Sequence, residues 1–430
     1  MQGAKGPLSR RATAALLQRL TAEVPDASAL QRHLAVEQAV SGSALYTGNR
    51  VGVLRDGPNT FAAMFAAIHG AQRYLYIEYY IFEDVSYQGE QLADLLIERR
   101  QQGVQIDLIF DGIGSLSTPK ELFDRLRAAG IHVRQFNPIK PFTAPFSIND
   151  RDHRKILIAD GQLAIIGGVN LSRDYQSGGG GSHSAPAATD MSVPAPGPQQ
   201  PERWHDVDLQ IDGPAVRALT QLFDQHWLDQ GGAAEELIGD VVPLAARGEE
   251  VVRIIGSEGG RLKPRYYATL LSAIRSAGTR IWVTAAYFVP THQEKEALAR
   301  AARGGVDVRL LLPSHSDSSA ALAAQQSHYT ELLGAGVRIY ERDKGILHSK
   351  SVVVDGVWSI VGSSNFDHRS LLFNDEVDAV VISVATGAQL DQYFQRDLER
   401  ASAIDLATWK RRPLTRKLRE HFWRLWEQLL

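Results

Sequence analysis

The chain has 430 residues, 44% hydrophobic and 22% charged, a balance typical of a globular protein large enough for two domains. It contains no cysteine, which excludes disulfides, thiolate catalysis and cysteine-ligated metals. The net charge of −3 disfavours a nucleic-acid-binding protein, and no apolar run reaches the roughly 18 residues that a membrane-spanning helix needs.

The N-terminal segment, residues 1–44, is predicted to be helical, with Leu16, Leu17 and Leu20 on one side of a helix and arginines elsewhere. We expect this segment to pack on the first lobe of the chain, residues 45–234; docking on a membrane surface is the alternative. The arginines also interrupt the apolar core that a secretory signal would need.

Residues 45–234 alternate between strand-like and helix-like patterns, which predicts an α/β lobe around a largely buried sheet. The expected strands are 74–82, 104–110 and one from 133 onward, and the expected helices are 61–71, 91–100, 119–129 and 215–228. A stretch rich in Gly and Pro, 176–201, is predicted to be a flexible surface insertion. Residues 235–250 are expected to connect this lobe to a second lobe, 251–430.

One motif occurs twice, and each distinctive residue of the first copy recurs 195 positions later, as 153 does at 348. The register relates His153 to His348, Lys155 to Lys350, Asp160 to Asp355 and Asn170 to Asn365. Shorter matches recur outside the motif, such as Gly103-Val104 with Gly305-Val306. Such an internal repeat predicts that the whole lobe was duplicated.

Each motif places an imidazole and an ammonium group on one face of a short strand, because side chains alternate along a strand. With the amide that follows, these groups suit an anionic oxygen, most simply a phosphate. A phosphodiester exchange needs a nucleophile on one side of phosphorus and a proton donor for the leaving oxygen. One histidine from each lobe can supply both, if the lobes face each other about a pseudo-twofold axis with the active site at their interface.

The repeated pattern His-x-Lys-x-x-x-x-Asp, followed each time by Gly-x-x-Asn, resembles the phospholipase D superfamily. The stretches 46–50 (YTGNR), 204–206 (WHD) and 365–376 (NFDHRSLLFNDE) are similar to the bacterial cardiolipin synthases in particular. The resemblance implies two duplicated phospholipase D-like α/β sandwich lobes. Many such synthases carry two N-terminal transmembrane helices, a pattern from which this chain departs, so we expect its membrane contact to be peripheral.

The resemblance also implies a role for each motif residue. His153 would be the nucleophile and His348 the general acid and base, and the near-symmetry of the lobes leaves this order open. The groups that would bind the non-bridging oxygens and stabilise charge in the transition state are Lys155, Lys350, Asn170 and Asn365.

Four acidic residues complete the candidate site. Asp206 and Glu376 follow the two histidines at comparable places and are candidates to hold their distal nitrogens. Asp160 and Asp355 are grouped with the catalytic motif, although we expect them to support the strand ends and the lysines rather than the chemistry. Because lysines and amides can replace a cation in charge stabilisation, we expect no metal and no other cofactor.

The implied function is a phosphatidyltransferase that makes cardiolipin from two phosphatidylglycerols, or from phosphatidylglycerol and phosphatidylethanolamine, through a phosphohistidine. A phospholipase D-type hydrolase is the alternative, because only the group that resolves the intermediate differs. A nuclease, or a catalytically inactive membrane-binding protein, fits the chain less well. The expected partners are an anionic phospholipid and a membrane surface at the cytoplasmic face of a bacterial inner membrane, with no nucleic acid and no obligate protein partner.

The C-terminal end is predicted to form a basic amphipathic helix that begins at Pro413. Its basic residues, among them Arg416 and Lys417, accompany Trp423 and Trp426. Such a helix can lie on anionic lipid, or its tryptophans can pack on the core, and the sequence leaves both interpretations open.

Overall fold

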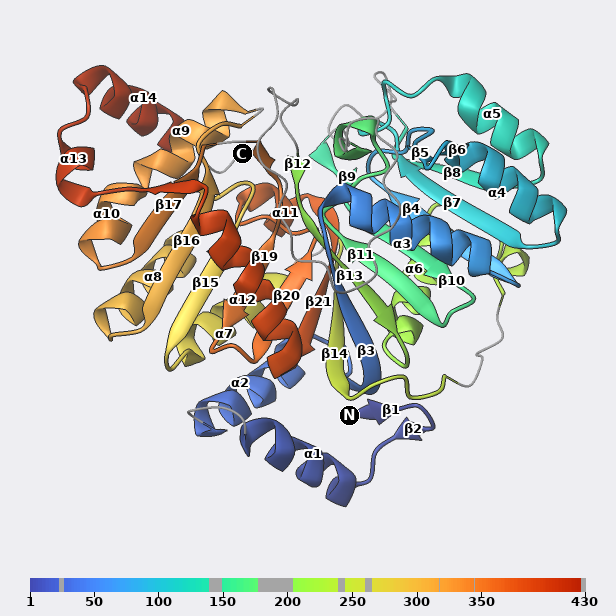
Figure 1. Ribbon diagram of the computed structural model, residues 1–430, viewed down its shortest axis with the longest axis horizontal. Helices are drawn as coiled ribbons and strands as arrows, with labels where there is room; N and C mark the ends of the chain where they lie inside the picture. The colour runs from blue at the N-terminus through green and yellow to red at the C-terminus, as the bar shows by residue number, and fades with distance from the viewer. Residues whose placement is uncertain are drawn as a thin grey trace.

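The computed structural model of the chain shows two α/β lobes side by side (Figure 1), and the predicted fold class is confirmed. Among the residues it describes, no helix has the length and apolar character needed to span a bilayer. Most of the insertion predicted at 176–201, and part of the connector, lie outside those residues. The described residues are 1–22, 27–138, 149–176, 204–238, 244–259, 265–316, 318–343 and 345–426.

The first lobe is built on a sheet with the strand order β8-β7-β4-β10-β11-β13-β3. Its strands are β3 (Tyr46–Arg55), β4 (Tyr74–Tyr79), β7 (Gln105–Asp111), β8 (His132–Phe136), β10 (Lys155–Ala159), β11 (Leu163–Gly167) and β13 (Val207–Asp212). Its helices are α3 (Asp56–Gly70), α4 (Leu92–Gln101), α5 (Lys120–Ala128) and α6 (Val216–Asp229), and a short hairpin joins β5 (Ser86–Tyr87) to β6 (Glu90–Gln91). Every side chain of β4 is buried, including that of Glu78, so the strand shows no alternation between apolar and polar residues.

The second lobe repeats this order as β17-β16-β15-β19-β20-β21-β14, with β22 added beside β17. Its strands are β14 (Glu250–Ser257), β15 (Arg280–Thr284), β16 (Asp307–Pro313), β17 (Arg338–Arg342), β19 (Ser351–Val354), β20 (Trp358–Gly362), β21 (Asn374–Ile382) and β22 (Ala401–Ala403). Its helices are α7 (Arg265–Ser276), α8 (His292–Arg303), α9 (Ser319–Ser327), α10 (Tyr329–Gly334), α11 (His368–Leu372), α12 (Val384–Leu398), α13 (Leu406–Lys410) and α14 (Leu414–Arg424).

The two sheets are joined edge to edge, because β3 of the first lobe pairs antiparallel with β14 of the second. A core cluster spans this junction and contains buried side chains of both lobes, such as Ile166 and Leu209 with Val361 and Val377. The lobes therefore share apolar interior as well as backbone hydrogen bonds, which fixes their relative position.

The N-terminal segment forms two helices, α1 (Arg10–Ala22) and α2 (Ala27–Val40), after a small hairpin of β1 (Gln2–Gly3) and β2 (Gly6–Pro7). The prediction that its helical part packs on the first lobe is wrong, although β1 pairs with β3 of that lobe. Leu30 and Leu34 are buried in the core of the second lobe, where α2 packs on α7 and His33 Nδ1 lies 3.0 Å from Ser272 Oγ. The periodicity of a helix reveals its apolar face but not the surface that covers it.

Candidate active site

Short strand pairs cross between the lobes at the two motif histidines. β9 (Arg151–Asp152), just before His153, pairs in parallel with the start of β21 in the second lobe. β18 (Ile346–Leu347), just before His348, pairs in parallel with β12 (Trp204–His205) of the first lobe. Each histidine is therefore placed by the backbone of the opposite lobe.

His153 contacts the second lobe through its backbone and its ring. Its backbone N–H donates to the Asp375 carbonyl at 2.9 Å, and its Nδ1 lies 3.1 Å from Glu376 Oε2. Burial, followed by the charge of Lys155, lowers the pKa of His153 despite the opposing effect of Glu376. The imidazole is therefore neutral at neutral pH, and its contact with Glu376 is made through Nδ1.

Glu376 is fully buried, and several donors surround its carboxylate. Besides His153, the donors are Ser363 Oγ, Ser370 Oγ (2.8 Å) and Asn374 Nδ2 (3.1 Å). Burial alone would raise the pKa of Glu376, but His153, Lys155 and Ser363 hold it below its ordinary value. Glu376 is accordingly an ionised partner that fixes the orientation of the His153 ring.

His348 makes the reciprocal contacts with the first lobe. Its backbone N–H donates to the His205 carbonyl at 2.8 Å, and its Nδ1 lies 2.7 Å from Asp206 Oδ2 and 3.0 Å from the Tyr175 hydroxyl. Burial, followed by the charges of both motif lysines and of His153, lowers the pKa of His348 well below its ordinary value. Burial also raises the pKa of Asp206.

The motif lysines are buried beside their own histidines. Lys155 Nζ donates to the His153 carbonyl at 2.6 Å, and Lys350 Nζ lies 3.0 Å from His348 Nδ1. Burial lowers the pKa of Lys155 to about 7 and also lowers that of Lys350. The charge of Lys155 reaches His348 in the other lobe and that of Lys350 reaches His153, so the four groups form one electrostatic cluster.

The two motif asparagines follow this cluster and have different contacts. Asn170 accepts the Ile81 N–H at 3.2 Å and donates to the Tyr175 hydroxyl at 3.4 Å. Asn365 is also buried, yet its side-chain oxygen has no hydrogen-bond partner in the described part of the chain. Within the described residues, the side-chain oxygen of Asn170 therefore accepts a hydrogen bond and that of Asn365 does not.

Asp160 and Asp355 do not reach this cluster, which corrects their grouping with the catalytic residues. Asp160 accepts the backbone N–H groups of residues 72–74 at the start of β4, and Asp355 accepts those of residues 278–280 at the start of β15. Both have φ near +53° in the Asp-Gly turn that ends a motif strand. Asp160 lies beyond the five residues of β10, roughly 16 Å along the strand from Lys155, so the two aspartates support strand ends but not the lysines.

Sequence reasoning missed a second aspartate in each lobe. Asp208 accepts the Val169 N–H at 3.1 Å, and Asp378 accepts the Ser364 N–H at 3.3 Å. A Cβ on Gly167 would lie 1.9 Å from Asp208 Oδ1, and a Cβ on the equivalent Gly362 would lie 2.2 Å from Asp378 Oδ1. The close approach of each aspartate explains why the motif repeats a glycine at this position. The signal was available, because 206 and 208 recur 170 positions later as 376 and 378.

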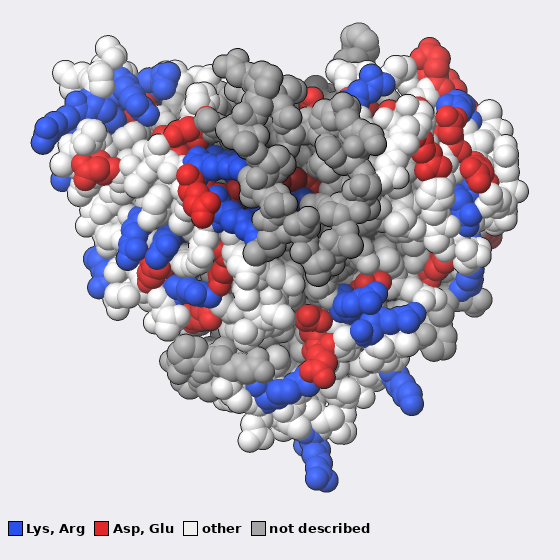
Figure 2. Space-filling view, in the orientation of Figure 1, with Lys and Arg blue, Asp and Glu red and all other residues white. Residues whose placement is uncertain are grey.

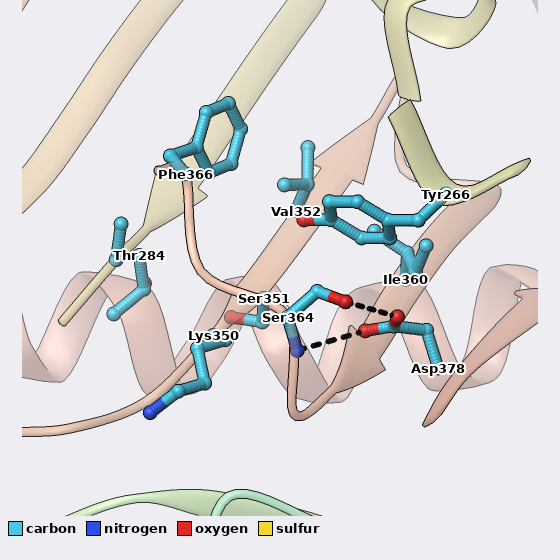
Figure 3. A pocket seen from close by; sticks show the side chains of 10 residues that line it. Tyr266, Thr284, Lys350, Ser351, Val352, Ile360, Ser364, Phe366 and Asp378 are labelled. Atoms are coloured by element: carbon cyan, nitrogen blue, oxygen red, sulfur yellow. Dashed lines mark hydrogen bonds between the residues drawn. The ribbon is translucent and has the colours of Figure 1, made fainter. Parts of the chain in front are cut away.

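Figure 3 shows a small pocket of the second lobe behind the motif lysine. Apolar side chains such as Tyr266 and Phe366 line it, and Ser364 Oγ bonds to Asp378 at 2.6 Å. The ammonium group of Lys350 points away from it, and it leaves essentially no space for a water molecule. The pocket therefore belongs to the packing that supports Lys350 and does not receive a substrate.

A buried cluster beside the site is the one group of described residues with the spacing of a metal site. Potential ligand atoms of Glu78, Asp152 and His226 lie within 4.8 Å of one another. Glu78 Oε1 already contacts His226 Nδ1 at 2.8 Å and the Arg154 guanidinium at 3.2 Å. Arg154 supplies a positive charge here and also donates to the Ser257 carbonyl at 3.0 Å, so the cluster links the lobes as an ion-pair network.

Comparisons with known proteins agree with this arrangement. The family described as "Cardiolipin synthase, PLD-like domain" matches residues 64–178 and 270–398, one stretch in each lobe. The cardiolipin synthase of Geobacillus kaustophilus is 34% identical over 389 residues, covering 89% of this chain and 72% of that protein. Cardiolipin synthase 2 of Bacillus anthracis is 33% identical, covering 88% of this chain and 70% of that protein.

A solved structure shares the fold. The phosphatidylserine synthase of Haemophilus influenzae superposes with a TM-score of 0.68 at 11% sequence identity, over 93% of this chain and all of that one. The family match covers more than half of the chain, in two copies that coincide with the two lobes. The chain therefore belongs to the cardiolipin synthase family of phospholipase D-like phosphatidyltransferases.

Proposed function

We propose that the protein makes cardiolipin by transferring a phosphatidyl group from one phosphatidylglycerol to a second, with phosphatidylethanolamine as the other candidate substrate beside phosphatidylglycerol. The observation that carries the proposal is the crossed pairing of His153 with Glu376 and of His348 with Asp206. Two oriented imidazoles from opposite lobes, each with a motif lysine beside it, are the groups that a double displacement at phosphorus requires.

In the first step, Nε2 of neutral His153 attacks the phosphorus of the donor and forms a phosphohistidine. The P–O bond to glycerol breaks, and His348 gives its proton to the departing oxygen. In the second step, His348 removes a proton from the hydroxyl of the acceptor, which attacks the phosphohistidine and releases His153. One diester is exchanged for another, so the reaction needs no nucleotide.

The lysines serve both steps. Lys155 and Lys350 would stabilise the charge on the non-bridging oxygens, with Asn365 and Asn170 beside them. Burial lowers the pKa values of His348 and both lysines in the free enzyme, and repulsion between cations lowers those of His348 and Lys155 further. An anionic phosphodiester opposes this repulsion, so substrate binding raises these pKa values and loads His348 with the proton that it donates.

Substrates of this kind are bilayer lipids. The protein is therefore proposed to work on a membrane surface, peripherally, at the cytoplasmic face of a bacterial inner membrane. Its relatives named cardiolipin synthase come from bacteria, and this supports the assignment.

The test is incubation of the purified chain with phosphatidylglycerol vesicles, followed by thin-layer chromatography. Cardiolipin and free glycerol are expected, and both should vanish in His153→Ala and His348→Ala. His69→Ala is the matched control, because His69 is half exposed and pairs with Glu90 away from the site. Phosphatidic acid as the sole product would make the protein a hydrolase, and cleavage of DNA in a parallel tube without lipid products would make it a nuclease.

A further inference from the structure

Helix α14 is attached to the second lobe by an ionic face. Glu420 is 1% exposed and receives the Arg412 guanidinium at 2.6 Å, with Arg416 Nε 3.5 Å away. Both guanidinium groups stack over the Trp409 ring at 4.7 Å. A surface helix ordinarily buries its apolar stripe and exposes its charges, and α14 buries a carboxylate instead.

The outer face of α14 is apolar. Five of the eleven large apolar side chains that are most exposed among the described residues lie within this helix and the turn after it. They are Leu414 (75% exposed), Leu418 (70%), Phe422 (53%), Leu425 (71%) and Trp426 (50%). Their spacing of three, four or eight residues places them along one side of the helix. A contiguous apolar stripe of this kind marks a surface that another phase or molecule covers.

Basic side chains surround the stripe. Residues 410–426 contain seven Lys or Arg and a single acidic residue, the buried Glu420, in a chain whose net charge is −3. Figure 2 shows blue side chains gathered at the corner where Figure 1 places α14. Arg411 and Arg419 are exposed there.

The helix lies at the edge of the sheet that carries the active site. Lys350 and His348 lie at the carboxyl end of β15, because Thr284 pairs with Ser351. The parallel strand β16 ends at the same edge and leads into α9, against which α14 packs. A surface that covers α14 would therefore lie on the side of the lobe where the catalytic groups are.

We propose that the exposed stripe of α14 docks the enzyme on a bilayer that contains anionic phospholipid, an inference that rests on the proposed function for the substrate in that bilayer. The apolar side chains would enter the acyl boundary while the basic residues meet the headgroups, as in interfacial amphipathic helices. A second copy of the same face is disfavoured by charge, because a two-fold contact would bring two basic clusters together.

The test is co-sedimentation of the full chain with vesicles of phosphatidylcholine, with and without phosphatidylglycerol. Leu414→Ser/Leu418→Ser/Phe422→Ser should lower the partition coefficient at least about 30-fold, because three inserted side chains are lost. Arg411→Ser/Arg419→Ser should lower it about 5-fold per charge, and only on the anionic vesicles. Leu228→Ser/Val384→Ser, which removes two side chains that are 41% exposed elsewhere, should bind like the wild type.

A parallel assay separates this proposal from the proposed function. The triple variant should keep wild-type turnover of phosphatidylglycerol in detergent micelles and lose it on vesicles. Wild-type protein that binds vesicles but turns over phosphatidylglycerol in neither micelles nor vesicles would refute the proposed function without refuting the docking surface. Undiminished vesicle binding by the triple variant would refute the docking surface. The docking surface would also be refuted if neither protein bound vesicles and light scattering showed a dimer for the wild type but a monomer for the triple variant.

Discussion

The two halves of the site carry the same motif but different supports. In the half around His153, the carboxylate partner Glu376 accepts hydrogen bonds from two serine hydroxyls. In the half around His348, the partner Asp206 accepts the backbone N–H of Val207 besides its contact with the ring. Burial raises the pKa of Asp206, whereas His153, Lys155 and Ser363 hold the pKa of Glu376 below its ordinary value, so the duplicated histidines face carboxyl groups in different environments.

The difference comes from two positions that the repeat makes equivalent. Ser363 corresponds to Gly168, where a Cβ would lie 2.2 Å from Asp206 Oδ1, and Ser370 corresponds to Tyr175. The hydroxyls of the second lobe stabilise a carboxylate, whereas the Tyr175 hydroxyl contacts the imidazole of His348 itself. The comparison teaches that a duplicated motif can hold its two partner carboxyl groups in different environments through the residues that touch them.

The largest expected effect is that of removing either histidine. His153→Ala and His348→Ala should each lower kcat at least about 10⁴-fold. With phosphatidylglycerol labelled in its acyl chains, wild-type enzyme denatured in detergent at neutral pH should carry label on His153, and His153→Ala should carry none, because a phosphohistidine is lost in acid but survives at neutral pH. Label trapped on His348 in the His153→Ala variant would reverse the assigned roles.

The next effect compares the carboxyl partners. Glu376→Gln should lower kcat about 10³-fold, because an amide cannot stabilise the charge and tautomer that an ionised carboxylate holds. Asp206→Asn should lower it about 10- to 100-fold, since the raised pKa of Asp206 means that its surroundings stabilise the ionised carboxylate less than those of Glu376 do. Steady-state kinetics would measure kcat for both variants, with circular dichroism as the folding control. A larger loss of kcat in Asp206→Asn than in Glu376→Gln would contradict the comparison.

The pH dependence sharpens the comparison through the lysines. The pKa of Lys155 is lowered to about 7, so its charge is present below that pH and is lost as pH rises through it. The kcat/KM of the wild type should therefore fall about tenfold per pH unit above this value. Lys155→Arg should move this limb to higher pH because a guanidinium stays charged. Lys350→Arg serves as the matched variant of the other half, and an unchanged limb in Lys155→Arg would exclude Lys155 as its source.

A smaller effect is expected from the equivalent hydroxyls. Tyr175→Phe and Ser370→Ala should each lower kcat about 5- to 10-fold, the value of one buried hydrogen bond. Because Tyr175 touches His348, its loss should also shift the limb of the kcat profile that reports the general acid. A shift of equal size in Ser370→Ala would mean that the hydroxyls position the site without distinguishing its halves.

The smallest effect is that of metal removal. Turnover should be unchanged by a divalent chelator, because lysines and amides stabilise the charge in this proposal. Colorimetric or chromatographic assay of cardiolipin formation suffices. Loss of activity in chelator, with recovery on adding a divalent ion, would contradict this and would indicate a metal site, for which Glu78, Asp152 and His226 are the candidate ligands.

The repeat in the sequence predicted both lobes and the motif residues, because hydrophobic periodicity and a fixed register are local signals. The crossing of Asp206 to His348 and of Glu376 to His153 was not predictable, since it depends on the pairing of β9 with β21 and of β12 with β18. These pairings involve two residues from each strand and leave no pattern in the chain. The placement of α1 and α2 on the second lobe also escaped prediction, because the apolar face of a helix does not specify the surface that covers it.

The crossed pairing also constrains how the chain can evolve. Duplication usually releases one copy from selection, so that it drifts or acquires a new task. Here each copy carries the carboxyl group that contacts its sister's imidazole, so the loss of either copy would leave the other histidine without this partner. The two copies are therefore expected to be retained together.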